Sequence, residues 1–169
     1  MPIDPADIRP LLAVRALGPA DVLAGGEGIL MEWDGAQWTK LFSPAGVKYL
    51  AMASGGDSVW VGTDAGYLWL RDATGWVKKS APVYYDYGAL WVDGEGRVSA
   101  TGPHPSPVSI LWQGTGDPWS SLEVSTPEGI PEPWAAGSNP QVNGLWARGP
   151  EDLFVVTQQQ QILRYAYHQ

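Results

Sequence analysis

The chain repeats one sequence module about four times, and this repeat limits its fold more than any other feature. The clearest copies are Leu12–Trp38 and Leu50–Trp76, in which the two leucines are 38 residues apart and so are the two tryptophans. Looser copies begin at Leu90 and at Leu145. A repeat of roughly 40 residues that holds several short strands indicates a protein built from similar sheets that pack side by side.

Turn residues divide each copy into short strands. In the first copy, Gly18-Pro19 and Asp34-Gly35 mark turns, and the expected strands are 11–16, 21–25, 29–33 and 37–42. The second and third copies predict strands at 49–53, 58–62, 67–71, 76–79, 89–92, 98–101 and 109–112, with a further strand after residue 119. The fourth copy predicts strands at 144–147, 153–157 and 162–167.

These strands predict an all-β fold, a β-propeller of four four-stranded blades of roughly 40 residues each. Residues 1–10 hold three prolines and are expected to form an arm before a propeller module at 11–169. The expected blades span about 11–45, 47–82, 88–126 and 142–169. The last blade is expected to be incomplete, because nothing after Tyr167 matches the strand that begins at Trp38 and Trp76.

Composition and charge exclude several classes of function. The net charge is −8, and Lys78-Lys79 is the one adjacent pair among ten basic residues, which argues against nucleic acid and against anionic membrane as partners. The chain has no cysteine, which excludes disulfides and thiolate chemistry. The sequence shows neither a signal peptide nor an apolar run long enough to span a bilayer, so we expect a cytoplasmic chain or part of a released assembly.

The sequence offers no constellation for catalysis. Its two histidines, His104 and His168, have no context that suggests a metal cluster or a Ser/His/Asp set. Asp93-Gly94-Glu95-Gly96 resembles a fragment of a calcium loop but lacks the following ligands, so we expect a hairpin turn there. We therefore assign no catalytic residue, no metal ligand and no cofactor.

One loop and one insertion are candidate binding sites. Val83–Tyr87 places Tyr84, Tyr85 and Tyr87 beside Asp86, and aromatic faces next to a carboxylate suit sugar rings or peptide side chains. The alternative is an aromatic cluster that packs between blades. Trp134, in the Pro/Gly-rich insertion at 126–141, is either an exposed anchor or a plug over a blade junction.

Other residues are expected to serve the architecture. Asp21 and Asp152 follow the first strand of their copies, where a carboxylate can accept hydrogen bonds from backbone N–H groups. Gly25, Gly62 and Gly102 end the second strand and are expected to allow close packing or a positive φ. Trp33 and Trp69 are interpreted as equivalent core residues near the end of the third strand.

The residue pattern of these copies resembles the propeller repeats of many bacterial proteins, which include WD40-like, kelch-like and sensor-propeller repeats. Leu12–Trp38 carries the Gly-Pro-x-Asp corner and the Asp-Gly turn of those repeats, Gly149–Phe154 repeats the corner, and Val59–Leu68 is similar to the sensor-propeller pattern. The resemblance covers about residues 11–167. It implies the fold, while function depends on sites that many unrelated propellers vary.

Three functions follow as hypotheses. The first is a non-enzymatic module for protein–protein interaction, such as a structural subunit of a bacterial or phage assembly. In this reading the chain binds a protein partner or itself, for example as a homodimer that closes an eight-bladed ring. The alternative is a lectin-like, carbohydrate-binding propeller. A propeller lyase or hydrolase is the third and least favoured hypothesis, because no cluster of titratable groups is visible.

Overall fold

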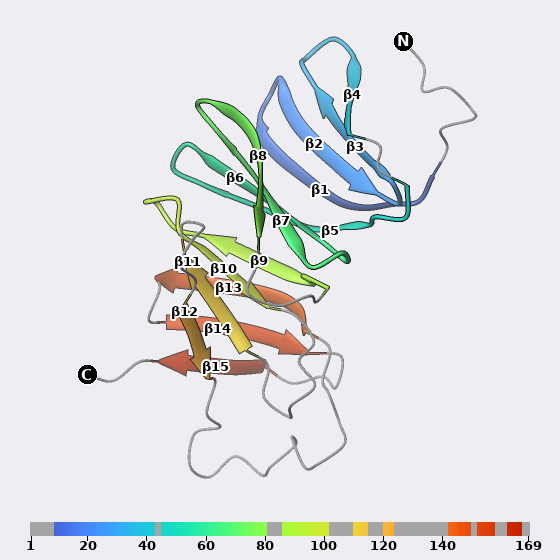
Figure 1. Cartoon of the computed structure of the whole chain (residues 1–169). Coiled ribbons are helices and arrows are strands. Elements are labelled where there is room, and N and C mark those ends of the chain that lie inside the picture. Colours follow the sequence, from blue (N-terminus) through green and yellow to red (C-terminus); the bar gives the residue numbers. More distant parts are fainter. Residues whose placement is uncertain are drawn as a thin grey trace.

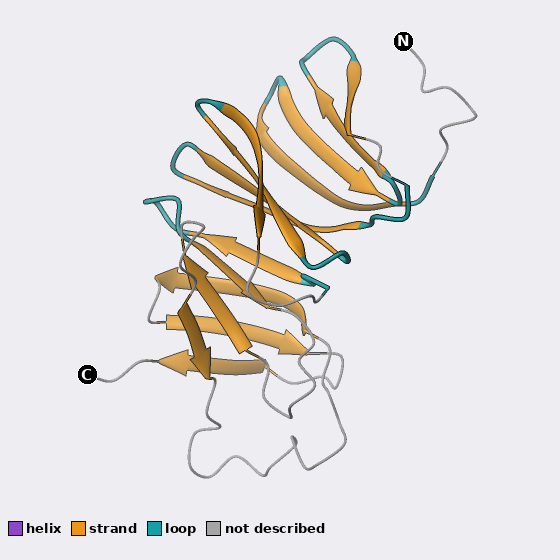
Figure 2. Cartoon of the chain, viewed as in Figure 1, coloured by secondary structure: helices purple, strands orange, loops and turns teal. Residues whose placement is uncertain are grey.

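A computed structural model describes the protein over residues 9–42, 45–80, 86–101, 110–114, 120–123, 142–149, 152–157 and 162–166. All regular secondary structure within these ranges is β-strand, and none of it is helical (Figure 2). The all-β prediction is therefore confirmed.

The strands form four antiparallel sheets, numbered one to four in chain order (Figure 1). Each strand pairs with the strands that precede and follow it in its own sheet. Sheets one and two comprise β1 (Leu11–Gly18), β2 (Asp21–Gly26), β3 (Ile29–Trp33), β4 (Trp38–Phe42), β5 (Tyr49–Gly55), β6 (Ser58–Thr63), β7 (Tyr67–Asp72) and β8 (Gly75–Ser80). Sheets three and four comprise β9 (Ala89–Val92), β10 (Val98–Thr101), β11 (Ile110–Gly114), β12 (Ser120–Glu123), β13 (Val142–Gly149), β14 (Asp152–Thr157) and β15 (Ile162–Ala166).

Aspartate side chains close the hairpins that the sequence predicted. Asp34 Oδ1 accepts hydrogen bonds from the backbone N–H groups of Ala36 and Gln37, both at 2.8 Å. Asp93 Oδ1 accepts from the backbone N–H groups of Glu95 and Arg97, both at 2.9 Å. The hairpin turn expected at 93–96 is thus present between β9 and β10. In both turns a short acceptor side chain satisfies backbone donors that the strands leave unpaired.

The sheets pack in succession through their first strands. β5 lies between β1 and β9, and β9 in turn contacts β13. Sheets one and four lie at opposite ends of the resulting arc, and the sheets do not close into a ring (Figure 1). That these four sheets are the full set of blades of one propeller stays a prediction.

The core consists of apolar side chains packed between neighbouring sheets. Between sheets two and three, Trp60 is fully buried among Leu68, Leu90 and Val98. The indole Nε1 of Trp60 donates a hydrogen bond to Gly96 O at 3.2 Å, so its polar atom is also satisfied. Between sheets one and two, a second cluster joins Leu30 to Tyr49 and Val61, with Phe42, Met52, Trp69 and Trp76 against it.

Two glycines at the ends of second strands permit this close packing. A Cβ added at Gly25 would lie 2.8 Å from the Cβ of Tyr49, and one added at Gly62 would lie 2.7 Å from the Cβ of Tyr87. Neither glycine has a positive φ, so close packing, and not backbone conformation, is what requires glycine here. Gly102 lies outside the described residues.

The interpretation of Trp33 and Trp69 as equivalent residues is wrong. In sheet one, Val22 pairs with Trp33, and Val59, at the matching place in sheet two, pairs with Arg71. Arg71 is therefore the counterpart of Trp33. The two tryptophans are 36 residues apart, whereas counterparts on the third strands are 38 apart, as Leu30 and Leu68 show by pairing with Gly25 and Gly62.

Candidate binding surfaces

The predicted loop before β9 contributes one core residue and one exposed residue. The ring of Tyr87 is 1% exposed and lies in the core between sheets two and three. Its backbone N–H donates to Thr63 O at 3.1 Å, and burial raises the pKa of its hydroxyl to about 12. For Tyr87 the alternative of packing between blades is therefore correct, and its ring is not presented to a ligand. Asp86 is exposed.

Tyr84, Tyr85 and Trp134 lie outside the described residues. Ligand binding by these three residues and by Asp86 stays a prediction.

A polar cleft of about 360 Å³ lies between sheets one and two. Two arginines from different sheets, Arg15 on β1 and Arg71 on β7, contribute to its lining. The other lining residues are Ala16, Leu17, Ser54, Gly56, Asp57, Ser58 and Val59. The sequence analysis had not selected either arginine.

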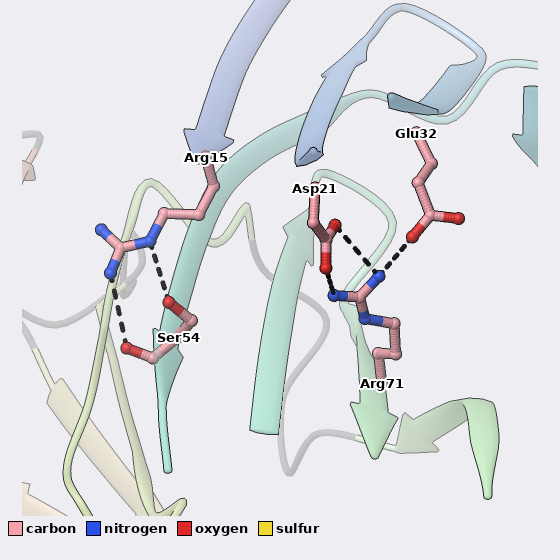
Figure 3. Close-up of polar contacts among 5 residues, drawn as sticks. All are labelled: Arg15, Asp21, Glu32, Ser54 and Arg71. Atoms are coloured by element: carbon pink, nitrogen blue, oxygen red, sulfur yellow. Dashed lines mark hydrogen bonds and ion pairs between the residues drawn. The ribbon is translucent and has the colours of Figure 1, made fainter. Parts of the chain in front are cut away.

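Arg71 links the two sheets through a pair of carboxylates (Figure 3). Its Nη2 donates to Asp21 Oδ2 at 2.9 Å, and its Nη1 is paired with Glu32 Oε1. Its guanidinium carbon also lies 5.8 Å from the ring centroid of Trp76. Since both carboxylates belong to sheet one, Arg71 forms its ion pairs across the sheet boundary at this end of the cleft.

Arg15 forms a second link across the same boundary. Its Nε donates to Ser54 Oγ at 3.0 Å, and its Nη2 lies 3.5 Å from Ser54 O (Figure 3). Both arginines thus use their hydrogen-bond donors to join sheets one and two. We therefore assign the two arginines at this cleft a structural role.

The aspartate at the start of a second strand differs from its expected role. Asp21 pairs with Arg71 of the next sheet, and Asp152 pairs with Arg164 of its own sheet, with Arg164 Nε 2.8 Å from Asp152 Oδ1. The hydrogen bond from Arg164 lowers the pKa of Asp152. Both carboxylates therefore bind guanidinium groups, where the sequence had suggested backbone N–H groups.

Large apolar side chains are exposed mainly on the first and last sheets. On β1 the exposed fractions are 54% for Leu11, 46% for Leu12 and 70% for Val14. On sheet four, Trp146, Val156 and Ile162 are exposed as well. Of the large apolar residues that the structure describes as exposed, one other, Val77, lies on a different sheet. Among the residues whose exposure the structure describes, exposed large apolar side chains are therefore concentrated at the two ends of the arc.

Two further features are absent from the described part of the chain. Within it, no group of three or more His, Cys, Asp or Glu residues is placed to hold a metal ion. None of its elements is a helix that is long and apolar enough to cross a membrane.

Comparison with known proteins bears on the fold. No model of a known protein family matches the chain, and no curated protein does either. Solved structures do match. The extracellular domain of a two component system from B. thetaiotaomicron has a TM-score of 0.66 and 13% identity, over 94% of this chain and 21% of that one. The neighbours are propeller-like. So is this chain.

Two other neighbours were solved with a bound ligand. YCF48 bound to D1 peptide has a TM-score of 0.56 and 13% identity, over 92% of this chain and 63% of that one. SapL1 lectin in complex with alpha methyl fucoside has a TM-score of 0.55 and 16% identity, over 92% and 59%. The chain spans less than two thirds of each of these proteins, and identities this low establish the fold alone.

Proposed function

We propose that the chain is a non-enzymatic binding and assembly module that acts by protein–protein contact, as a structural subunit of a larger assembly or by self-association. One observation carries this proposal, namely the exposed apolar side chains of the two terminal sheets, among them Val14 and Ile162. Contiguous apolar surface on a folded protein marks an interaction site, because leaving it in water forfeits the free energy of its burial.

Two neighbours in the comparison support a protein partner. YCF48 was solved with a peptide bound. A second neighbour is a chain of the mitotic checkpoint complex, with a TM-score of 0.55 and 15% identity over 98% of this chain and 63% of that one. One neighbour thus holds a peptide and the other is part of a protein complex, which supports a protein partner for this chain.

Differential capture tests the proposed function. Immobilised wild-type chain is compared with Val14→Lys and Ile162→Glu, which place a charge on one terminal face each. Val77→Glu is the matched control, because Val77 is an exposed apolar residue (39%) on neither terminal sheet. We expect a captured protein that binds wild type and Val77→Glu but no longer binds Val14→Lys or Ile162→Glu. Capture that is equal for all four chains would refute the proposal.

Carbohydrate binding is the second candidate. It is favoured by the lectin among the neighbours and by the exposed carboxylate of Asp86, next to the tyrosines of the same loop. A glycan array with wild type, Tyr85→Ala and Asp86→Ala tests it. Sugar binding that both substitutions abolish would support this candidate, and an array without signal would remove it.

The absence of enzyme activity is part of the proposal. It is supported by the role of the charged groups at the cleft, where Arg71 is paired with Asp21 and Glu32. Those groups stabilise one another and the junction between two sheets. A general acid or base needs a titratable group that is free to exchange a proton with a substrate.

A further inference from the structure

We infer that the partner of the terminal faces is a second copy of the chain, bound head to tail, with sheet one of each copy packed on the outer face of sheet four of the other. This inference rests on the proposed function, since it names the protein that the two faces bind. Its basis is that the molecule already contains the same contact three times, between its own consecutive sheets.

One position on the first strand of each sheet makes this contact. Val14, Met52 and Leu90 follow one another at intervals of 38 residues. The strand register gives the counterpart in sheet four: Met52 is paired with Val61, and Leu145 is paired in the same way with Val155. The position is therefore apolar in all four sheets.

In sheets two to four this residue packs against the preceding sheet. Met52 contacts the cluster that includes Leu30 of sheet one. Leu90 belongs to the cluster built around Trp60 of sheet two. Leu145 packs with Ala89 and Trp91 of sheet three. In sheet one, Val14 is 70% exposed, so the residue that should meet a preceding sheet meets solvent.

Sheet four exposes the opposite half of this contact. Successive side chains of a strand point to opposite faces, so Trp146 lies on the face away from Leu145 and sheet three. Trp146 pairs with Phe154, and Val156 pairs with Ile162, which places these four residues on one face. Trp146, Val156 and Ile162 are 56%, 40% and 74% exposed.

The same face is buried in the preceding sheets. The register makes Phe154 the counterpart of Trp60: Trp60 pairs with the residue after Met52, and Phe154 pairs with the residue after Leu145. Trp60 is 0% exposed because sheet three covers it. Sheet four thus presents the surface that elsewhere in the chain receives the first strand of a following sheet.

A second copy is the occupant that fits both faces at once. The two faces are the two halves of one repeated interface, and they lie at opposite ends of the arc (Figure 1). A head-to-tail contact between unlike faces forms a closed ring when its rotation returns to the start. Two copies would give eight sheets, within the usual range of about four to eight propeller blades.

Light scattering on the full chain tests the inference. At micromolar concentration we expect twice the chain mass of 18.2 kDa. Val14→Lys alone and Ile162→Glu alone should each weaken the dimer on the order of tenfold or more, because each buries an unpaired charge. Val77→Glu should keep the dimer mass. Circular dichroism of every variant establishes that its sheets remain folded.

Mixing the two charged variants tests the head-to-tail geometry. In an equimolar mixture of Val14→Lys and Ile162→Glu, one junction joins two unaltered faces and the other joins Lys to Glu. We expect the dimer mass to return. A contact between like faces predicts instead that one variant dimerises alone and that mixing restores nothing.

Two results would overturn the inference. One is a wild-type chain that stays at its own mass, and the other is a dimer that both charged variants leave intact. If the wild type is a monomer but loses a captured protein with Val14→Lys, then the protein-binding function stands and only the second copy is excluded. If capture is also unaffected, both proposals fail.

Discussion

Substitution of Gly62 by alanine measures how tightly sheets two and three are pressed together. The new methyl group would lie 2.7 Å from the Cβ of Tyr87 and 3.2 Å from its carbonyl oxygen. Neither atom can swing aside by a rotamer change, because one is the first atom of the side chain and the other is backbone. The sheets must therefore move apart locally, and the contacts of the Trp60 cluster loosen.

The expected loss of stability follows from two opposing terms. Overpacking costs roughly 1–3 kcal/mol, and replacing glycine by alanine returns roughly 0.4–1 kcal/mol through the unfolded chain. The net loss is then about 1–2 kcal/mol, or a melting temperature lower by about 2–8 °C for a chain of this size.

Urea denaturation and thermal melting give the two measurements, with Gly18→Ala as the control. A Cβ at Gly18 meets nothing within 4 Å, and its φ is not in the left-handed region, so this variant should equal or slightly exceed wild type. Two outcomes would refute the reasoning. One is a Gly62→Ala protein as stable as wild type, and the other is an equal loss in both variants.

Three further predictions concern polar groups. Arg71→Met should lower the free energy of unfolding by about 1–2 kcal/mol, because it leaves two carboxylates without their shared partner at a partly buried site. An unchanged urea midpoint would contradict this. Burial alone would raise the pKa of Asp93, but hydrogen bonds from Arg97 and from the backbone outweigh it and hold that pKa below its usual value. The ionised Asp93 carboxylate therefore stabilises the folded chain above about pH 4, and this stabilisation is lost as the pH falls through the lower, folded-state pKa. The urea midpoints of wild type and Asp93→Asn should then converge in acid. Tyr87, with a pKa of about 12, stays protonated in the folded chain above pH 10 while the unfolded chain ionises. Wild type should therefore lose on the order of 2–3 kcal/mol relative to Tyr87→Phe between about pH 10 and 12, and parallel pH profiles would exclude this.

The strands could be predicted from the sequence because their limits are set locally. Turn residues such as Asp34 and Asp93 act on neighbours two to four positions away, so their effect is visible in a short stretch of chain. The match of Trp33 to Trp69 failed because it relied on residue type. The two tryptophans are 36 positions apart, whereas the interval of 38 residues leads from Trp33 to Arg71.

The contacts between sheets were harder to predict. Asp21 and Arg71 are 50 positions apart, and their ion pair depends on how two sheets are stacked. The repeat alone does not single out Arg71, because its counterpart in the first copy, Trp33, is a residue of a different type. Tyr87 could have been placed, since it follows Tyr49 at the same interval of 38 residues and Tyr49 is also fully buried. The aromatic composition of its loop suggested a ligand site, with packing between blades as the alternative.

The pairing of each strand with its neighbour in the chain has a consequence for how this protein folds. Every ladder that the structure describes joins consecutive strands, so hairpins can form before distant parts of the chain meet. Sheets that contact only the next sheet behave as units on a line, where stability is a sum of unit and junction terms. Within one copy of the chain, the two middle sheets have a junction on each side, and each end sheet has one. In the dimer-weakening variant Val14→Lys, amide hydrogen exchange should therefore be slowest in β6 and β10 and fastest at the ends of the arc.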